Sequence, residues 1–258
     1  MWTPLVVQKS DLDKVDYDSL ITGRIPAIIL KGFYDKKSCE SIVSKVMTTP
    51  SGDSQKKILN HIGPFLMSYA TNKTEYFAQA EKTKKKFAKI FSEKENPTKR
   101  IFNMLKMVFP ESKIKLANES GKKFSPFVIR IHELGKSIPI HKDHVGYEGK
   151  EYSISNIDYQ LSCVLHLQES EKGGNLIIYN KNWKKTDEKH RNIEFGYSAQ
   201  VVNSEKSCRI SNLESGDLVL INPIQYHEVT TIQGSTPRIT LGMFLGFSNN
   251  ESKIISWA

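Results

Sequence analysis

Cysteine is scarce in this chain of 258 residues: its three cysteines, Cys39, Cys163 and Cys208, lie far apart and form no Cys-x-x-Cys pair. Such sparse thiols exclude a disulfide-stapled framework and are typical of a reducing compartment. Long hydrophobic runs are missing as well. The longest are stretches such as 27–30, whereas a membrane span needs about 18 apolar residues. The sequence reaches the charge of Lys9 too early for the apolar core of a signal peptide. We therefore expect a cytoplasmic protein without a membrane partner.

Arginine is also scarce, although the chain is basic. Lys and Arg number 37 against 28 Asp and Glu, a net charge of +9, yet only six of the basic residues are Arg. Base recognition and bidentate phosphate contacts favour arginine, whereas lysine is a strongly hydrated point charge. The lysines are also spread along the chain, with one dense run at 82–86. We interpret the charge as a solvated surface and do not expect nucleic acid as a partner.

The chain otherwise reads as one globular domain over 1–258. Apolar residues make up 38% of it, too many for a disordered protein, and no repeat or linker divides it. In its first part, apolar residues recur at spacings of three and four, which predicts helices near 38–47, 74–91 and from residue 97. We expect 1–124 to be a mainly helical support.

Alternation with a period of two replaces this pattern after about residue 125. The predicted strands are 126–132, 160–167, 175–179, 217–222 and 238–247, with shorter ones near 138–141, 199–202 and 227–232. Short strands without intervening helices argue for an antiparallel sandwich or barrel. The expected fold class is therefore mainly β with α: a barrel core over 125–250, with the functional residues at its mouth, buttressed by the helical part.

His141-Lys142-Asp143 is the first group of residues that indicates chemistry. On an extended segment, positions i and i+2 project to the same side, so the imidazole and the carboxylate can reach one metal ion. Alone, such a pair is more often a surface feature. His227 follows a strand 86 residues later and completes a set of two histidines and one carboxylate. This facial triad is typical of non-haem Fe(II) oxygenases, with positions left open for a bidentate co-substrate and O2.

Arg238 opens the apolar strand that follows His227. An unpaired arginine inside a barrel is costly, so it needs an anionic partner. A guanidinium that holds a carboxylate through two parallel hydrogen bonds meets this need. The alternative is a salt bridge at the end of a strand.

The order His141-x-Asp143, His227, Arg238 resembles the Fe(II)/2-oxoglutarate-dependent dioxygenases, which are built on a double-stranded β-helix, a jelly-roll or cupin-like barrel. The strand and glycine turn at 127–135 also fit. Within that superfamily, the stretches 173–183 and 237–247 look like the carrier-protein-independent halogenases of the welwitindolinone and hapalindole type. The resemblance implies Fe(II), 2-oxoglutarate and O2 as cofactor and co-substrates, with the distal carboxylate of 2-oxoglutarate paired with Arg238.

One departure from those halogenases bears on the reaction. They carry glycine where Asp143 stands, which leaves a coordination position for chloride. With the carboxylate present, the resemblance implies hydroxylation with release of succinate and CO2. Desaturation or ring closure at the same site stays open, because those outcomes depend on how the substrate lies.

Further site residues are predicted from neighbouring positions. Thr240 shares the face of Arg238 and could bond the same carboxylate, although a strand threonine needs no function. His132 stands where many relatives place a tyrosine that touches the co-substrate, but a core histidine is an equal alternative. Arg130 shares that face and could serve a substrate anion or a structural ion pair.

Substrate contacts are expected from the loops that close over such barrels. Tyr147 follows the first metal motif, and Trp183 and Phe195 lie in the long polar connection 181–197. A connection of this length in a compact domain is more often functional than idle. We take Tyr147 and Trp183, together with Arg130, as the predicted substrate-binding residues.

The leading hypothesis is a hydroxylase of a free small molecule. A peptide or protein hydroxylase on the same scaffold is harder to separate, because prolyl-type enzymes share the Gly173-Gly174 strand pattern. A nucleic-acid dealkylase would usually carry a second arginine six residues after the first, where this chain has Phe244. A non-catalytic metal-binding barrel is the third class. The sequence carries no signal for an oligomeric state.

Overall fold

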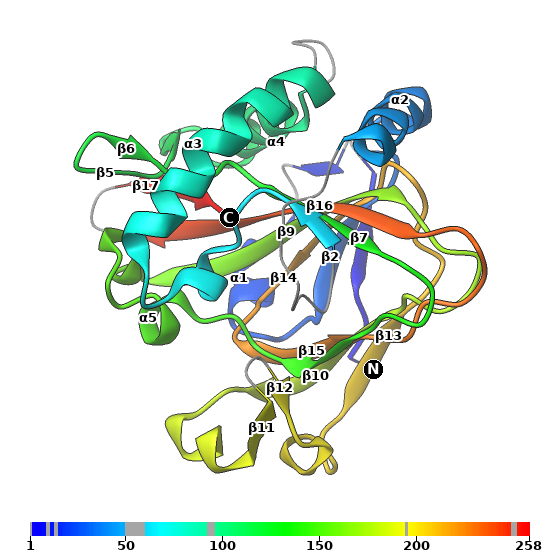
Figure 1. Ribbon diagram of the computed structural model, residues 1–258. Helices are drawn as coiled ribbons and strands as arrows, with labels where there is room; N and C mark the ends of the chain where they lie inside the picture. Colours follow the sequence, from blue (N-terminus) through cyan, green and yellow to red (C-terminus); the bar gives the residue numbers. More distant parts are fainter. Residues whose placement is uncertain are drawn as a thin grey trace.

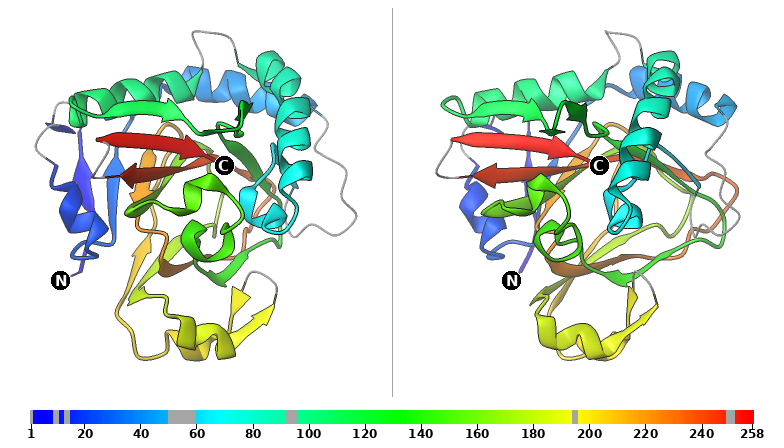
Figure 2. Two further views of the ribbon diagram at one scale, coloured as in Figure 1. Left: turned by 90° about the vertical axis from the view of Figure 1, so that its left-hand side faces the viewer. Right: turned by 60° about the vertical axis from the view of Figure 1, so that its left-hand side comes forward.

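The computed structural model of the protein describes residues 2–8, 11–12, 15–49, 60–91, 96–193, 196–248 and 252–258. It consists of a layer of helices, a large sheet and a smaller sheet, stacked in that order (Figures 1 and 2). The large sheet has the order β1 (Leu5–Val7), β2 (Ala27–Leu30), β14 (Leu218–Ile221), β9 (Tyr159–Gln168), β16 (Arg238–Ser248), β17 (Lys253–Trp257), β4 (Lys113–Leu116). Two further strands join it, since β7 (Val128–His132) pairs with β16, and β3 (Asn60–Ile62) pairs with β7.

The smaller sheet has the order β13 (Ser207–Ile210), β10 (Leu176–Asn182), β15 (Gln225–Val229), β8 (Ile138–His141). Two short ribbons lie apart from both sheets: β5 (Asn118–Glu119) with β6 (Lys122–Lys123), and β11 (Arg191–Ile193) with β12 (Gly196–Tyr197). In the described chain the two sheets are separate hydrogen-bonded units, so the strands form no closed barrel. The architecture is sheet-rich with helices, as expected.

The side chains of β16 point alternately into two different interiors of the molecule. Its odd-numbered residues, such as Leu241 and Leu245, pack into the large hydrophobic core beneath the helices. Its even-numbered residues, such as Arg238 and Thr240, line a cavity between the two sheets. Because successive side chains of a strand point to opposite faces, one continuous apolar strand serves both interiors.

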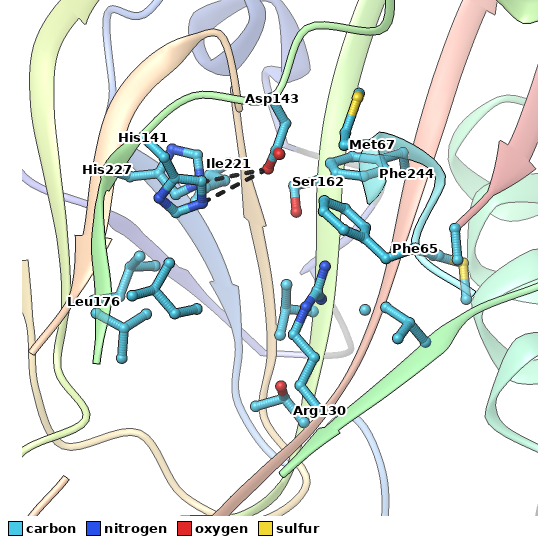
Figure 3. A pocket seen from close by; sticks show the side chains of 18 of the residues that line it. Phe65, Met67, Arg130, His141, Asp143, Ser162, Leu176, Ile221, His227 and Phe244 are labelled. Atoms are coloured by element: carbon cyan, nitrogen blue, oxygen red, sulfur yellow. Dashed lines mark ion pairs between the residues drawn. The ribbon is translucent and has the colours of Figure 1, made fainter. Parts of the chain in front are cut away.

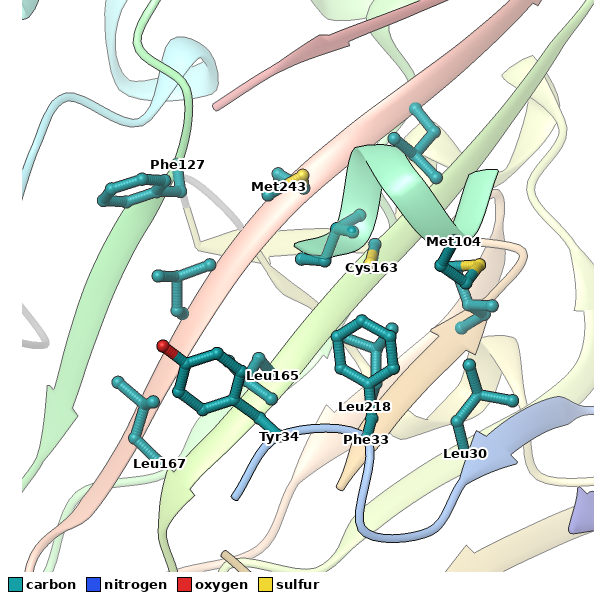
Figure 4. Close-up of a cluster of buried hydrophobic side chains, with 14 of the residues drawn as sticks. Leu30, Phe33, Tyr34, Met104, Phe127, Cys163, Leu165, Leu167, Leu218 and Met243 are labelled. Atoms are coloured by element: carbon teal, nitrogen blue, oxygen red, sulfur yellow. The ribbon is translucent and has the colours of Figure 1, made fainter. Parts of the chain in front are cut away.

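The helices that cover the large sheet are α2 (Lys36–Thr48), α3 (Lys73–Ile90) and α4 (Pro97–Val108). Each begins with a side-chain cap, from Asp35, Asn72 and Asn96 respectively, that accepts a hydrogen bond from a free backbone N–H of the first turn. Figure 4 shows Met104 of α4 together with Cys163 and Leu165 of β9 within this core. The three predicted helices are thus confirmed to within a few residues.

The remaining helical segments are short. They are α1 (Tyr17–Ile21), α5 (Val145–Glu148) and the 3-10 turns η2 (Leu66–Tyr69), η3 (Ser153–Ser155), η4 (Lys185–His190) and η5 (Ala199–Val201). The strand predicted near 199–202 was wrong, since this segment forms η5, whose cap is Ser198. No helix in the described segments combines the length and the apolar character that a membrane crossing requires.

The first 124 residues contribute more than helices. Four of their strands, β1, β2, β3 and β4, hydrogen-bond into the large sheet. Three of them span only three or four residues with one face partly exposed, and β2 is buried along its whole length. Strands of three or four residues are too short for a sustained period-two pattern, and β4 (Lys-Ile-Lys-Leu) alternates over four residues only, which is why only helices were predicted here. Residues 1–124, which were expected to be a mainly helical support, therefore also form an integral part of the large sheet.

Replacing Leu241 with Ala should destabilise the protein by about 2–5 kcal/mol, because its side chain is fully buried between β7 and β9 and its loss leaves a cavity. Chemical unfolding measures the change. Leu134→Ala is the matched control: this leucine is 66% exposed, so its loss should change stability by no more than about 0.5 kcal/mol. Equal effects of the two substitutions would contradict the assignment of the core.

Candidate metal centre and cavity

The structure brings His141, Asp143 and His227 together. His141 ends β8 and lies directly opposite His227 of β15 in the register of the smaller sheet. Their ring centroids are 4.1 Å apart. Oδ2 of Asp143 lies 3.9 Å from Nε2 of His141 and 3.7 Å from Nε2 of His227. Figure 3 shows both rings directed at the carboxylate, and the three ligand atoms lie within 4.8 Å of one another.

Backbone carbonyls fix the tautomer of both histidines. Nδ1 of His141 donates to the carbonyl of Pro139, and Nδ1 of His227 to that of Gln225, each at 2.8 Å. A carbonyl only accepts, so each Nδ1 carries the proton and each Nε2 keeps its lone pair. A metal-binding histidine is typically oriented in this way by its other ring nitrogen.

Burial sets the charge of these groups. It lowers the pKa of His141 to about 4 and that of His227 to about 3, and it raises the pKa of Asp143. Both rings are therefore neutral at pH 7, which is the form that binds metal. A buried carboxylate beside two neutral rings is costly, and a divalent cation would offset that cost. Two nitrogens and one oxygen on one side of the cavity fit such an ion.

The cavity that contains this triad has a volume of about 290 Å3. Its walls are mainly apolar and come from both sheets and from the turn η2; they include Phe65, Met67, Val128, Ile138, Val164, Leu176, Val219, Ile221, Val229 and Phe244. Among these walls stand a few polar groups, as in most small-molecule sites. Sequence reasoning missed Phe65 and Met67, which lie at the short turn η2, where no motif marks them.

Arg238 and His132 form the far end of the cavity. Nη1 of Arg238 donates to Nδ1 of His132 at 3.0 Å, so the neutral ring of His132 carries its proton on Nε2. That Nε2 and Nε of Arg238 are buried without a hydrogen-bond partner. Thr240 lies on the same face and is also buried. Unsatisfied buried donors are costly, and a carboxylate would accept from all three side chains, so this end fits such a group.

Glu169, which does not line the cavity, offsets the charge of Arg238. Its Oε2 lies 3.7 Å from Nε of Arg238, and its Oε1 accepts a hydrogen bond of 2.5 Å from Nδ1 of His166. His166 lines the cavity from β9. No sequence motif marks Glu169, because it follows the strand in a run of polar residues.

Tyr147 and Trp183 do not line the cavity. Their rings lie 4.4 Å apart and enclose the ammonium of Lys142, which is 4.8 Å from the Tyr147 centroid and 4.5 Å from the Trp183 centroid. Lys142 also pairs with Glu148, which in turn pairs with Arg191. The predicted substrate-binding pair thus holds the middle residue of the His-x-Asp motif. Phe195 lies outside the described residues. Arg130, the third predicted substrate contact, lines the cavity opposite Thr240.

Replacing His132 with Gln should flatten the pH dependence of stability. Burial, with two nearby arginines adding to it, holds the pKa of His132 well below 6.5 in the folded protein, whereas the unfolded chain takes up a proton near that pH. The unfolded state therefore binds more protons below about pH 6.5, and stability falls as pH falls, by up to about 1.4 kcal/mol per pH unit for this group.

Urea unfolding of the metal-free protein between about pH 5 and pH 7 measures this slope. His132→Gln should show the smaller slope. His190→Gln, at a partly exposed histidine outside the cavity, is the control and should keep the wild-type slope. Identical slopes in all three proteins would refute the prediction.

Comparison with known proteins agrees with this geometry. The model of the family described as carrier-protein-independent halogenase WelO5 matches residues 5–258, while curated protein sequences give no significant match. An N-substituted L-amino acid dioxygenase from Burkholderia ambifaria AMMD has a similar structure, with a TM-score of 0.61 and 12% identity over 93% of this chain and 89% of that one.

Two further solved structures share the fold. The non-haem α-ketoglutarate-dependent epimerase SnoN from nogalamycin biosynthesis gives a TM-score of 0.54 at 11% identity, over 92% of this chain and 84% of that one. HygX from Streptomyces hygroscopicus, solved with nickel and 2-oxoglutarate, gives a TM-score of 0.52 at 13% identity, over 91% of this chain and 88% of that one. At such identities the likeness is one of fold, that of the Fe/2-oxoglutarate oxygenases. The family match spans almost the whole sequence, so the chain belongs to the carrier-protein-independent halogenase WelO5 family, with an intact His-x-Asp…His triad.

Proposed function

We propose that the protein is an Fe(II)- and 2-oxoglutarate-dependent oxygenase that hydroxylates an unactivated C–H bond of a free small molecule and releases succinate and CO2. The observation that carries this proposal is the cavity itself: two Nε2 lone pairs and a carboxylate stand at one side, and Arg238 closes the far end. The bound 2-oxoglutarate of HygX and of the Burkholderia dioxygenase supports the co-substrate. In this proposal the two facing sheets are those of a double-stranded β-helix.

Asp143 supports hydroxylation over halogenation within this family. It supplies a third protein ligand beside the two histidines. An octahedral ion with three protein ligands and a bidentate co-substrate retains one position, which O2 needs. A halide would therefore have no position of its own.

The roles of the chain's own residues follow from their places. Iron with 2-oxoglutarate, when bound, supplies the activation of O2 and the oxidation of the substrate carbon. His141, Asp143 and His227 hold the metal ion. Arg238, with Thr240 and the Nε2–H of His132, holds the distal carboxylate of 2-oxoglutarate. The apolar walls exclude water and present a C–H bond to the metal.

A small molecule suits this cavity better than a macromolecule does. A volume of about 290 Å3 is at the lower end of ligand sites, and it must hold the co-substrate as well. Phe244, in place of the second arginine of the dealkylases, adds an apolar wall. Both features favour a compact, largely apolar substrate over a nucleotide or a folded protein.

Replacing Arg238 with Met should weaken 2-oxoglutarate binding at least tenfold, because hydrogen bonds between charged groups contribute about 1.5–3 kcal/mol. Anaerobic titration of the Fe(II) protein with 2-oxoglutarate, followed by the weak visible charge-transfer band of the chelate, measures the affinity. Arg209→Met is the matched control, since Arg209 is exposed on β13 and does not line the cavity. Wild-type protein that binds iron and yet gives no band would refute the proposed function.

A further inference from the structure

Arg130 is the second arginine of the cavity. It lies on β7, directly opposite Thr240 of β16, and its side chain extends along the cavity toward Ser162 and the ring of Phe65 (Figure 3). The metal ligands lie on the other side of the same space. Arg130 is near enough to Asp143 for their opposite charges to interact. It thus places a positive charge beside the metal centre.

Among the residues that the structure describes, the guanidinium of Arg130 makes no direct ion pair, although Asp143 is an opposite charge near it. It also makes no hydrogen bond to the described residues. Its Cζ lies over the ring of Phe65, 5.0 Å from the centroid, in a cation–π contact. Arg238, in contrast, has Glu169 and His132 beside it. Burial lowers the pKa of Arg130, as expected for a desolvated cation. Arg130 is only partly exposed and lines the cavity. A desolvated arginine without a direct anionic partner is costly, and an anion bound in the cavity would offset that cost.

Gly242 makes room for this guanidinium. A Cβ at position 242 would collide with Nη1 of Arg130, and the φ angle of Gly242 is not one that requires glycine. Glycine is therefore needed here for space and not for backbone conformation. The side chain of Arg238 runs elsewhere, past Gly174, which lies two residues before β10. The two arginines consequently serve different parts of the cavity.

We propose that Arg130 is a second carboxylate-binding residue of this cavity, placed at the metal end and held there by Gly242 and Phe65. The proposal rests on the function proposed above. The carboxylate belongs either to the substrate, which is then an organic acid, or to the metal-proximal end of 2-oxoglutarate. Phe65 and Phe244, whose rings lie 6.3 Å apart, border the same space and suit an acid with an apolar or aromatic body.

Three variants test the proposal: Arg130→Met, Arg130→Lys and Gly242→Ala. Thermal unfolding of the metal-free protein is the first measurement. Since Arg130 makes no direct ion pair or hydrogen bond with the described residues, Arg130→Met should raise the melting temperature, by about 2–4 °C if about 1 kcal/mol is gained. A residue with a structural role would give a lower melting temperature.

Ligand binding is the second measurement and separates the two sources of the carboxylate. The affinity of the Fe(II) protein for 2-oxoglutarate is measured by the charge-transfer band. Calorimetry then compares 3-phenylpropanoate with its neutral analogue 3-phenylpropanamide on the Fe(II)–2-oxoglutarate protein. A tenfold loss of 2-oxoglutarate affinity in Arg130→Met assigns the carboxylate to the co-substrate. Loss of a preference for the acid over the amide, with 2-oxoglutarate affinity unchanged, assigns it to the substrate.

In either case Gly242→Ala should reproduce the loss, because it displaces the guanidinium, and Arg130→Lys should retain part of the binding through its charge. The proposal is wrong if Arg130→Met lowers the melting temperature and changes neither 2-oxoglutarate affinity nor an acid-over-amide preference. Wild-type protein that fails to bind 2-oxoglutarate at all would refute the proposed function separately. In that case the melting temperature and the acid-and-amide comparison, repeated on the Fe(II) protein alone, still decide the role of Arg130.

Discussion

The position of β16 between β7 and β9 is the constraint on which both interiors depend. Its odd side chains fill the core under the helices, and its even side chains form one wall of the cavity. A shift of one residue in its register would exchange these sets, burying Arg238 among leucines and turning leucines into the cavity. The hydrophobic core therefore fixes where Arg238 and Thr240 stand in the cavity. Stability and site geometry are two consequences of one strand register.

Charge is distributed unevenly within the cavity. Arg238 has Glu169 behind it, and Lys142 is paired with Glu148. The protein thus satisfies these two cations with its own carboxylates. Asp143 and Arg130 are the exceptions, since each is enclosed without an ionic partner of its own in direct contact. Two groups of opposite sign that lack direct ionic partners in one cavity would each be stabilised by a ligand, Asp143 by a cation and Arg130 by an anion.

The sequence predicted the parts of the molecule that depend on local pattern. Alternating strands, capped helices and the spacing of His141, Asp143 and His227 are all visible along the chain, and the structure places them as expected. The short strands of the N-terminal part were missed because tertiary pairing, and not alternation, makes them strands. Tyr147 and Trp183 were predicted to touch substrate because of their loops. Whether an aromatic ring on a loop faces a cavity or a lysine depends on contacts that no local pattern records.

Lys142 shows how a surface connection can control a buried site. It stands between two of the metal-binding residues, so on an extended segment its side chain must point away from the metal. There it is buried between Tyr147 and Trp183 and paired with Glu148. Trp183 in turn donates to Glu188, and Arg191 bonds both Glu188 and Glu148. Because a lysine held by two rings and a carboxylate cannot move alone, the spacing of the metal ligands is tied to the conformation of the connection that begins at β10.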